Sequence, residues 1–515
     1  MENRSCGTDA PRAALGTRRL HARVVLAFVL STSIFISCGG DQPARSTEPA
    51  PSHAAPSLSQ QGLRLQILLA QLHHDSGSKR REAATDLGSL GDPAAVPALK
   101  DALDDEDSSV RSEAASALGF IGEPAAVGAL SDALDDVDPS VRWSAAQALG
   151  FIADPAAVPA LSEALNDADS FVRSVAVEAL VAIGDSGAVE PLLALVAVKP
   201  TATVAVGERD PFLEAVRALG TLGDARAVAR LLELAAGPAD VDSLTVLLVT
   251  QAADDALDAI GPAAIPALTG AVGSPDAKIA LAATTALGRR GPAAIPGLAK
   301  SVRSPHADAA LAAVTALGRL GAPALDPLLA ALGDKRSAIR VAAASALGGF
   351  GKPALKPLFA ALKHKDAALR VAAATSLGQI GDRAATSPLI AALADAKVAQ
   401  EHGGDRGLFH EASAALASIH RGDATALVKY LKVQKTVGVY YALIRIGQAD
   451  TRSALVTALR KFGDVSMAEE YLNSGEPTLE KTARDWAKAH GYTVGPSWYP
   501  PCIGPRCSGP AWGGG

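Results

Sequence analysis

Apolar residues recur along most of the chain with the spacing of amphipathic helices. In the segment 110–121, Ala114, Ala117 and Leu118 fall on one helical face. A shorter apolar segment, 96–103, precedes it, and turns rich in Gly, Pro or Asp separate such segments. The pattern therefore predicts a unit of two helices, which we call helix A for the long segment and helix B for the short one.

This two-helix unit is repeated along the chain. The segment 111–127 closely resembles the segment 142–158, which lies 31 residues later. A leucine marks the same position in every unit: Leu87, Leu118, Leu149, Leu180, Leu219, Leu257, Leu287, Leu317, Leu347, Leu377, Leu416 and Leu443. Most of these leucines are 30 or 31 residues apart. Self-similarity at such a period is typical of solenoids, whose units bury their apolar faces against one another. The predicted fold is all-α, an α-solenoid of about twelve helix pairs over residues 61–463.

The repeated residues resemble those of a known family. Leu118 and Gly119, followed by a turn with Gly122 and Pro124, are similar to the short HEAT repeats of phycobilisome-lyase-like proteins. The resemblance extends over roughly residues 62–463. It implies an α-solenoid with helices A outside and helices B on the concave face. A fold of this kind does not by itself define a function.

The N-terminus resembles a bacterial lipoprotein signal. Arginines within 18–23 precede an apolar run over 24–36, which is too short to span a membrane comfortably. The run ends in Phe-Ile-Ser-Cys-Gly, which is similar to a lipobox with Cys38 as the lipidated residue. This resemblance implies a signal peptide over 1–37 and export to the cell envelope. With Gly39 after the cysteine, it also implies sorting to the outer membrane in a host that has one. The alternatives are an ordinary signal peptide or an uncleaved anchor.

Both ends of the predicted array have their own composition. Residues 38–60 are rich in Pro, Ser, Ala and Gly, which favours a flexible tether. Residues 464–492 have the pattern of two last helices that cap the array, and 493–515 form a Pro- and Gly-rich irregular tail. Cys502 and Cys507 in this tail are candidates for a disulfide, because exported proteins meet oxidising conditions.

The repeat period is broken in three places, at 198–210, 236–242 and 394–409. Insertions of this kind form loops, which often contact a partner. Degeneration of a repeat explains them equally well.

Charge is distributed unevenly along the predicted array. Residues 80–172 hold five Lys or Arg and eighteen Asp or Glu, whereas residues 288–383 hold an excess of Lys and Arg. Such a polarised surface can steer a charged partner to one end. Drift of solvated turn charges during repeat duplication gives the same pattern. A net charge of −6 and an aromatic content of 4% argue against nucleic-acid binding.

We expect a protein partner to contact the exposed faces of helices B and the basic turns. The candidate contact residues placed on helices B by periodicity are Lys100, Asp101, Asp132, Glu163, Lys300 and Phe359, and those chosen for their charge are Arg303, Lys335, Arg336, Lys363 and Lys365. Phe359 is the favoured apolar anchor, because the aligned positions elsewhere are mostly small or polar.

The wider HEAT group also contains an enzyme, deoxyhypusine hydroxylase, which uses several His-Glu pairs to hold two irons. This chain has one such pair, His410 and Glu411, which cannot supply the ligands of a di-iron site. These two residues and the His-His-Asp cluster at 73–75 are therefore only weak metal candidates, and no cofactor is expected. We find no motif typical of the bilin lyases that share these repeats.

The sequence thus predicts a non-catalytic scaffold that binds one or more proteins on its concave helix-B face. The signal implies that the scaffold is lipid-anchored at the bacterial cell envelope. The alternatives are an enzyme or enzyme accessory similar to the bilin lyases or the hydroxylase, and a purely structural spacer.

Overall fold

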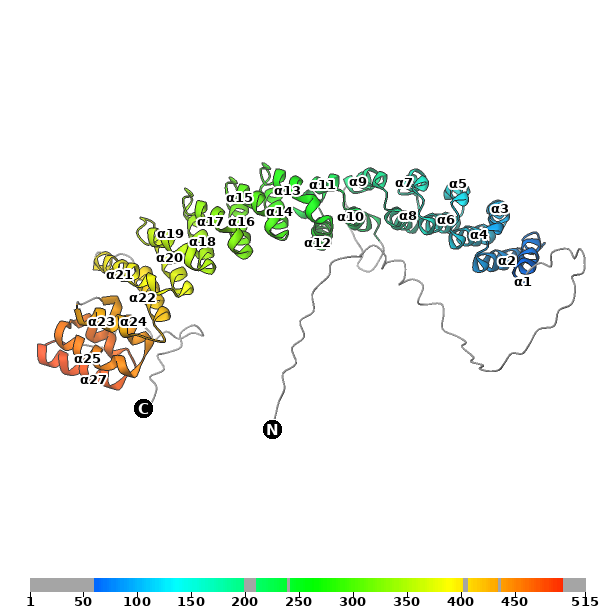
Figure 1. Ribbon diagram of the computed structural model, residues 1–515. Helices are drawn as coiled ribbons and strands as arrows, with labels where there is room; N and C mark the ends of the chain where they lie inside the picture. The colour runs from blue at the N-terminus through cyan, green and yellow to red at the C-terminus, as the bar shows by residue number, and fades with distance from the viewer. Residues whose placement is uncertain (1–59, 199–209, 239–240, 402–405, 434–436, 494–515) are drawn as a thin grey trace, which may run out of the picture. The chain divides into compact units, whose positions relative to one another are not determined.

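The computed structural model describes residues 60–198, 210–238, 241–401, 406–433 and 437–493, and all regular structure among them is helical (Figure 1). The prediction of an all-α repeat fold is therefore confirmed. None of the described helices is long and apolar enough to cross a bilayer.

Long and short helices alternate from the first repeat onward. After α1 (Gln60–Gln71), the long helices A of the first four repeats are α2 (Gly77–Leu90), α4 (Ser108–Ile121), α6 (Pro139–Ile152) and α8 (Ser170–Ile183). The short helices B that follow them are α3 (Val96–Asp101), α5 (Val127–Asp132), α7 (Val158–Ala164) and α9 (Val189–Ala197). A 3-10 turn precedes each of these helices B, so each pair has nearly the same geometry.

The alternation continues beyond the first break in the period. The long helices are α10 (Pro211–Leu222), α12 (Ser243–Ile260), α14 (Ala277–Gly288), α16 (Ala307–Leu320), α18 (Ser337–Leu347), α20 (Ala367–Ile380) and α22 (Arg406–Ile419). The helices between them are α11 (Val228–Ala235), α13 (Ile265–Ala271), α15 (Ile295–Val302), α17 (Leu325–Ala331), α19 (Leu355–Ala361) and α21 (Thr386–Glu401). The array ends with α23 (Thr425–Val433), α24 (Val437–Ile446), α25 (Ala449–Phe462), α26 (Val465–Leu472) and α27 (Pro477–His490).

The helix boundaries follow from local chemistry. The side chain of Asp107 accepts a hydrogen bond from the backbone N–H of Ser109 and so caps the first turn of α4. The helix ends at Gly122, whose φ of 77° lies in the left-handed region that favours glycine. Pro124 then begins the 3-10 turn that leads into α5. The same order of cap, stop and turn recurs in the neighbouring repeats, so the boundaries were visible in the sequence.

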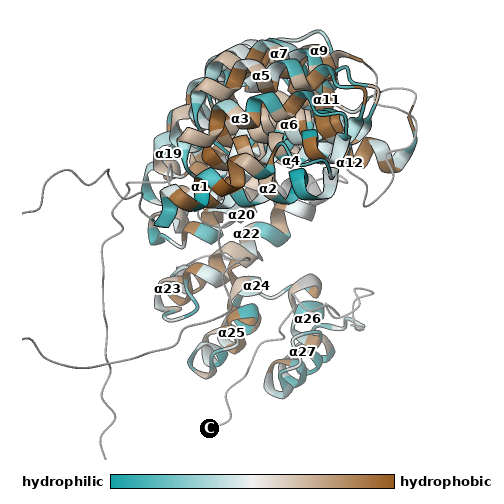
Figure 2. Ribbon diagram, turned by 90° about the vertical axis from the view of Figure 1, so that its right-hand side faces the viewer, coloured by the Kyte–Doolittle hydropathy of each residue, from teal (hydrophilic) through white to brown (hydrophobic). Residues whose placement is uncertain are grey.

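The core consists mainly of Ala, Leu and Val from both helices of each pair. Figure 2 shows hydrophobic and hydrophilic segments alternating along the helices, as expected for amphipathic helices. Successive helices A approach one another very closely. A Cβ built on Gly119 of α4 would lie 2.7 Å from the Cα of Ala148 of α6. Small residues at this contact therefore set the spacing between repeats.

The close contact corrects one expectation. The family resemblance implied that helices B line the concave side, but it is successive helices A that pack directly against one another. The helices B of the first four repeats, in contrast, share few contacts with one another. The row with the closer spacing lies on the inner side of the bend between neighbouring repeats, and in Figure 1 that row is α2, α4, α6 and α8.

Candidate protein-binding surfaces

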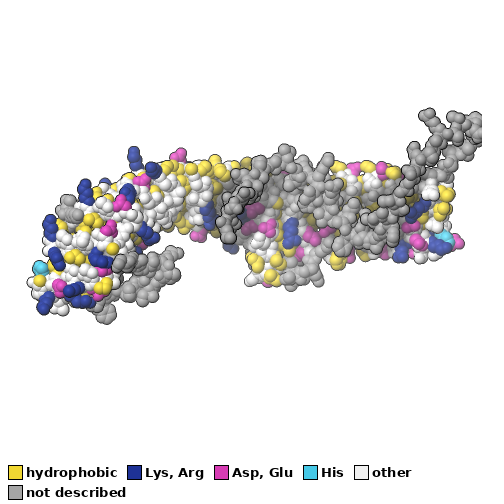
Figure 3. All heavy atoms as spheres, turned by 60° about the horizontal axis from the view of Figure 1, so that its bottom comes forward, with side chains coloured by type: hydrophobic (Ala, Val, Ile, Leu, Met, Phe, Trp, Pro, Cys, Tyr) yellow, Lys and Arg dark blue, Asp and Glu magenta, His cyan; other side chains and the backbone are white. Residues whose placement is uncertain are grey.

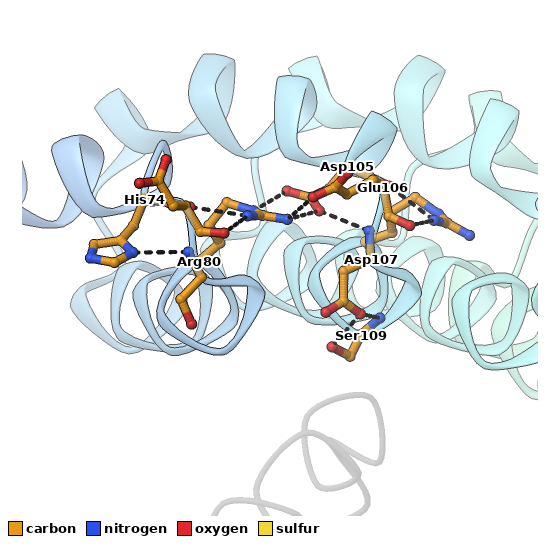
Figure 4. A network of polar contacts seen from close by, with 9 residues as sticks. His74, Arg80, Asp105, Glu106, Asp107 and Ser109 are labelled. Carbon is orange, nitrogen blue, oxygen red and sulfur yellow. Dashed lines mark hydrogen bonds and ion pairs between the residues drawn. The ribbon is translucent and has the colours of Figure 1, made fainter.

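The turns that join a helix B to the next helix A carry most of the charge, and we call them BA turns. In the first of the acidic BA turns, Arg80 of α2 makes a two-pronged contact with Asp105 (Figure 4). Its Nε donates to Oδ2 at 2.6 Å and its Nη2 to Oδ1 at 2.7 Å. Its Nη1 donates to the backbone oxygens of His74 and Asp75, which belong to the preceding turn. One guanidinium therefore ties two successive turns together.

The arrangement recurs and forms what we call the arginine ladder, made of Arg80, Arg111, Arg142 and Arg173. Arg111 pairs with Asp136 at 2.7 Å, and Arg142 pairs with Asp167 at the same distance; the sequence analysis did not identify these pairs. Arg111, Arg142 and Arg173 each donate to two backbone oxygens of the preceding turn.

The ladder changes the charge that the acidic turns present to solvent. The hydrogen bonds from Arg80 and Arg111 hold the pKa of Asp105 and of Asp136 below the usual value. These carboxylates are mostly buried in their ion pairs, whereas Asp104 stays exposed. One carboxylate in each of these turns is thus held in an ion pair, while other acidic residues of the same repeats stay exposed.

The BA turns that follow α15, α17 and α19 carry the opposite charge. Four of the predicted contact residues are exposed on them: Arg303, Lys335, Lys363 and Lys365. Arg336 differs, because its guanidinium is partly buried and donates to Asp334 and to the backbone oxygens of Val302 and Ser304. Arg336 therefore joins two repeats, and its role as a partner contact stays a prediction. Figure 3 shows Lys and Arg side chains gathered over the C-terminal half of the stack.

The other predicted contacts lie on helices B, the row that packs less closely. Exposed acids are found at three of the positions, namely Asp101, Asp132 and Glu163. Lys100 donates to the backbone oxygen of Ala125 at 3.4 Å, and Lys300 donates to that of Thr269 at 2.9 Å. These two lysines therefore bridge neighbouring repeats. Phe359 is partly buried against the core, which leaves only part of its ring for a partner.

The weak metal candidates have other contacts. Glu411 accepts a hydrogen bond from Thr375 at 3.0 Å, and the ring of His410 packs edge-on against Phe409 and Tyr441. In the 73–75 cluster, Nδ1 of His74 accepts a hydrogen bond from the backbone N–H of Ser76. No group of three potential metal ligands occurs among the residues that the structure describes.

A set of surface aromatic residues was not predicted from the sequence. Phe120, Phe151 and Phe171 are exposed, and Trp143 is partly exposed, on the helices A of three successive repeats. The available signal was their position: a ring follows the repeated Leu-Gly pair in α4 and α6, whereas Ser89 follows it in α2.

Several predictions concern residues outside the described ranges. Cys38, Cys502 and Cys507 are among them, as are residues 199–209, 239–240 and 402–405 within the three predicted insertions. The lipidation and the disulfide therefore stay predictions.

Comparison with known proteins identifies the repeats. A family model for HEAT repeats matches residues 65–149, 128–206, 295–358 and 325–401, and a model for the PBS lyase HEAT-like repeat matches residues 213–237. No match was found among proteins of curated function.

Solved structures give similarities of the same kind. A chain of the CpcE–CpcF complex of phycocyanin lyase from Nostoc is 25% identical, covering 54% of this chain and 100% of its own, with a TM-score of 0.28. Human deoxyhypusine hydroxylase is also 25% identical, covering 56% of this chain and 96% of its own, with a TM-score of 0.22. Importin beta is 16% identical, covering 83% and 67%, with a TM-score of 0.32. Together with the helix pairs described above, the matched family models show that this chain contains HEAT repeats.

Proposed function

We propose that this chain is a non-catalytic scaffold that binds a protein partner, and that a lipid on Cys38 anchors it at the bacterial cell envelope. The observation that carries the proposal is the state of the lysines on the basic BA turns. Lys335, Lys363 and Lys365 are exposed and make no hydrogen bond or ion pair with any described residue, whereas the neighbouring Arg336 is tied to its own scaffold.

Unpaired, exposed lysines in successive repeats form a positive surface. Such a surface attracts an acidic partner, raises the rate of association and selects against basic proteins. The acidic BA turns of the first repeats give the same edge of the stack the opposite sign. A partner with a matching distribution of charge would be oriented along the array, which is what a scaffold requires.

The test is a cross-linked affinity capture of the full chain from native membranes. The variant Lys335→Glu/Lys363→Glu/Lys365→Glu is compared with the wild type, and Arg336 is left intact because it supports the fold. The matched control is Lys352→Glu/Lys356→Glu/Lys488→Glu, which changes the net charge equally at exposed positions away from the BA turns. We expect one stoichiometric partner with the wild type and the control, and at least about tenfold less with the variant. The proposal would be contradicted if the wild type, the variant and the control captured the same amount of partner, or if the wild type captured no partner.

The anchor is tested separately with Cys38→Ser. We expect this variant to lose incorporation of a labelled fatty acid and to leave the membrane fraction. Membrane association that persists without the label would identify an uncleaved anchor instead.

A further inference from the structure

The aromatic residues of the first four repeats lie at the surface. Within the described residues 60–198 the aromatic side chains are Phe120, Trp143, Phe151 and Phe171. The core of these repeats is built from Ala, Leu, Val and Ile. Aromatic side chains normally contribute most to folding stability when they are buried. Their placement outside the core therefore calls for another explanation.

Two of these rings form a stacked pair in solvent. The ring centroids of Phe120 and Phe151 are 5.8 Å apart with an angle of 27° between the planes, and the residues are 69% and 49% exposed. They occupy the same position in α4 and α6, where α2 has Ser89 and α8 has Ala182. Because a serine or an alanine serves this position in neighbouring repeats, the packing of the stack does not require a ring there.

The other two rings line a shallow depression. Trp143 of α6 and Phe171 at the start of α8 surround it together with Pro139, Ser140 and Asp169. Trp143 and Phe151 are eight residues apart on α6, so they lie on the same helical face, about 12 Å apart along the axis. The depression and the stacked pair therefore belong to one surface, which we call the aromatic surface.

The charge around the aromatic surface is negative. Asp169 lines the depression, Glu113 lies seven residues before Phe120 on the same face of α4, and Glu178 is exposed on α8. Arg111 and Arg142 are paired with Asp136 and Asp167, and Arg173 donates to backbone oxygens of the preceding turn. A cation stacked on Phe120 or Phe151 would therefore lie over π-faces on a surface of net negative charge.

We propose that the aromatic surface binds a basic, partly apolar segment of a partner protein. Lys or Arg side chains of the segment stack on Phe120 and Phe151, and an apolar side chain enters the depression beside Trp143. An extended chain spans the 12 Å between the two subsites with about four residues, so the basic and apolar side chains are about that far apart in the segment. The inference rests on the proposed scaffold function and names the chemistry of one of its contacts.

The occupant follows from charge complementarity. An acidic segment, or a polyanion such as a nucleic acid, would be repelled by the net charge of residues 80–172. Aromatic and cationic groups that meet at the centre of an interface usually carry most of its binding energy. The exposed rings are therefore the groups whose removal weakens binding most.

The probe for the test is a fluorescein-labelled extended peptide in which arginine and leucine alternate at a spacing of about four residues. A second peptide replaces each arginine with citrulline, which keeps the shape and removes the charge. Fluorescence anisotropy measures the affinity of the full chain, of Phe120→Ser/Phe151→Ser and of Leu247→Ser. Leu247 is a matched control, because it is a 61% exposed apolar residue on α12.

We expect the phenylalanine variant to bind the arginine peptide about tenfold more weakly than the wild type and the Leu247→Ser control do. The wild type should prefer the arginine peptide over the citrulline peptide by a similar factor. Circular dichroism should be unchanged, because the substituted rings lie outside the core. Equal affinity for the two peptides, or equal affinity of the phenylalanine variant and the wild type, would overturn the inference. Sedimentation that shows a dimer of the wild type and a monomer of the phenylalanine variant would also overturn it, since a second copy would then cover the surface.

The experiments distinguish failure of the aromatic contact from failure of the scaffold function. If the peptide assay fails while the capture depends on Lys335, Lys363 and Lys365, the scaffold stands and only the aromatic contact is lost.

Discussion

The acidic repeats of α2–α8 and the basic repeats of α14–α20 use the same helix pair but hold their neighbours differently. In α2, α4 and α6 an arginine ties two BA turns together, through the pairs of Arg80 with Asp105, Arg111 with Asp136 and Arg142 with Asp167. The aligned positions in α14 and α16 are Ala280 and Ala310, which are buried and cannot make such a tie. The contact between helices A also relaxes: a Cβ on Gly288 would meet only the Cβ of Ala316, at 3.0 Å.

One scaffold therefore offers two kinds of surface. In the acidic repeats, where the ladder pairs one carboxylate of each turn, aromatic rings are exposed beside the remaining acids. At α18 a ladder-like pair returns, that of Arg340 with Asp366, yet the added lysines of the BA turns stay unpaired among the described residues. Binding chemistry is therefore set by the positions that the repeat packing leaves free.

The largest expected effect comes from breaking the ladder. Arg111→Ala leaves Asp136 mostly buried without its cation, and we expect a loss of about 3 kcal/mol in the stability of the adjoining repeats. Arg173→Ala removes contacts to backbone oxygens only, among the described residues, and should cost about 1 kcal/mol. Hydrogen exchange of α4, α6 and α8 measures both. Equal losses would show that the ion pair adds nothing to the carbonyl contacts.

The contact between helices A gives the next effect. Gly119→Ala forces apart two backbones, since its Cβ would lie 2.7 Å from the Cα of Ala148, and should cost about 2 kcal/mol. Gly288→Ala meets a looser contact, and the gain in helix propensity of about 1 kcal/mol offsets most of its strain. Urea unfolding followed by circular dichroism compares them. A larger loss at Gly288 would reverse the assignment of the tighter region.

The stability of the repeats and that of the C-terminal helices should depend on pH in opposite ways. The folded-state pKa of Asp105 and Asp136 is lowered by their arginines, and that of Asp334 is lowered to about 2 by Arg336. Their contribution to stability is therefore present above the unfolded value of 3.8 and is lost as pH falls toward 2.

Glu470 in α26 should respond in the opposite sense. Burial, with repulsion from Glu469, raises its pKa to about 7, so the unfolded chain gives up this proton at lower pH than the folded chain does. The stability of the C-terminal helices should fall as pH rises from about 4.5 to about 7. Hydrogen exchange of α26 and α27 at the two pH values measures this. Glu470→Gln should remove this pH dependence of stability. If the stability of the variant still falls with rising pH, another titrating group is responsible.

The smallest expected effect is that of Phe120→Ser on stability. The ring is 69% exposed and Ser89 holds its position in α2, so the change should lie within about 0.5 kcal/mol. A loss above 2 kcal/mol in urea unfolding would show that the stacked pair is part of the fold and weaken the case for a binding surface.

Much of the fold was predictable from sequence because its signals are local. The helix predicted over 110–121 spans Ser108–Ile121 in the structure. The two capping helices predicted within 464–492 span Val465–Leu472 and Pro477–His490. Aspartate caps, glycine stops and helical periodicity fix these boundaries within a few residues. The pattern of one repeat could be checked against the next, which strengthened each prediction.

The surfaces were less predictable because they depend on contacts between repeats. The close approach of Gly119 to Ala148 shows that helices A pack more closely than helices B. The periodicity within one helix does not predict this contact. The tie of Arg336 to the preceding repeat likewise spans more than thirty residues, from Val302 and Ser304. The contacts that Lys100 and Lys300 make with a neighbouring repeat were hidden from the sequence for the same reason.

Cross-linking mass spectrometry of the captured complex tests the two-surface account most directly. We predict that the wild type forms cross-links from Lys335, Lys363 and Lys365 to an acidic part of the partner. A photoreactive residue at Gln147, between the two aromatic subsites, should cross-link to a basic segment of the same protein. Reversal of the three lysine charges should abolish capture, and Phe120→Ser/Phe151→Ser should remove the cross-link at Gln147 alone. Cross-links from both regions to acidic segments, or none from either, would contradict the account.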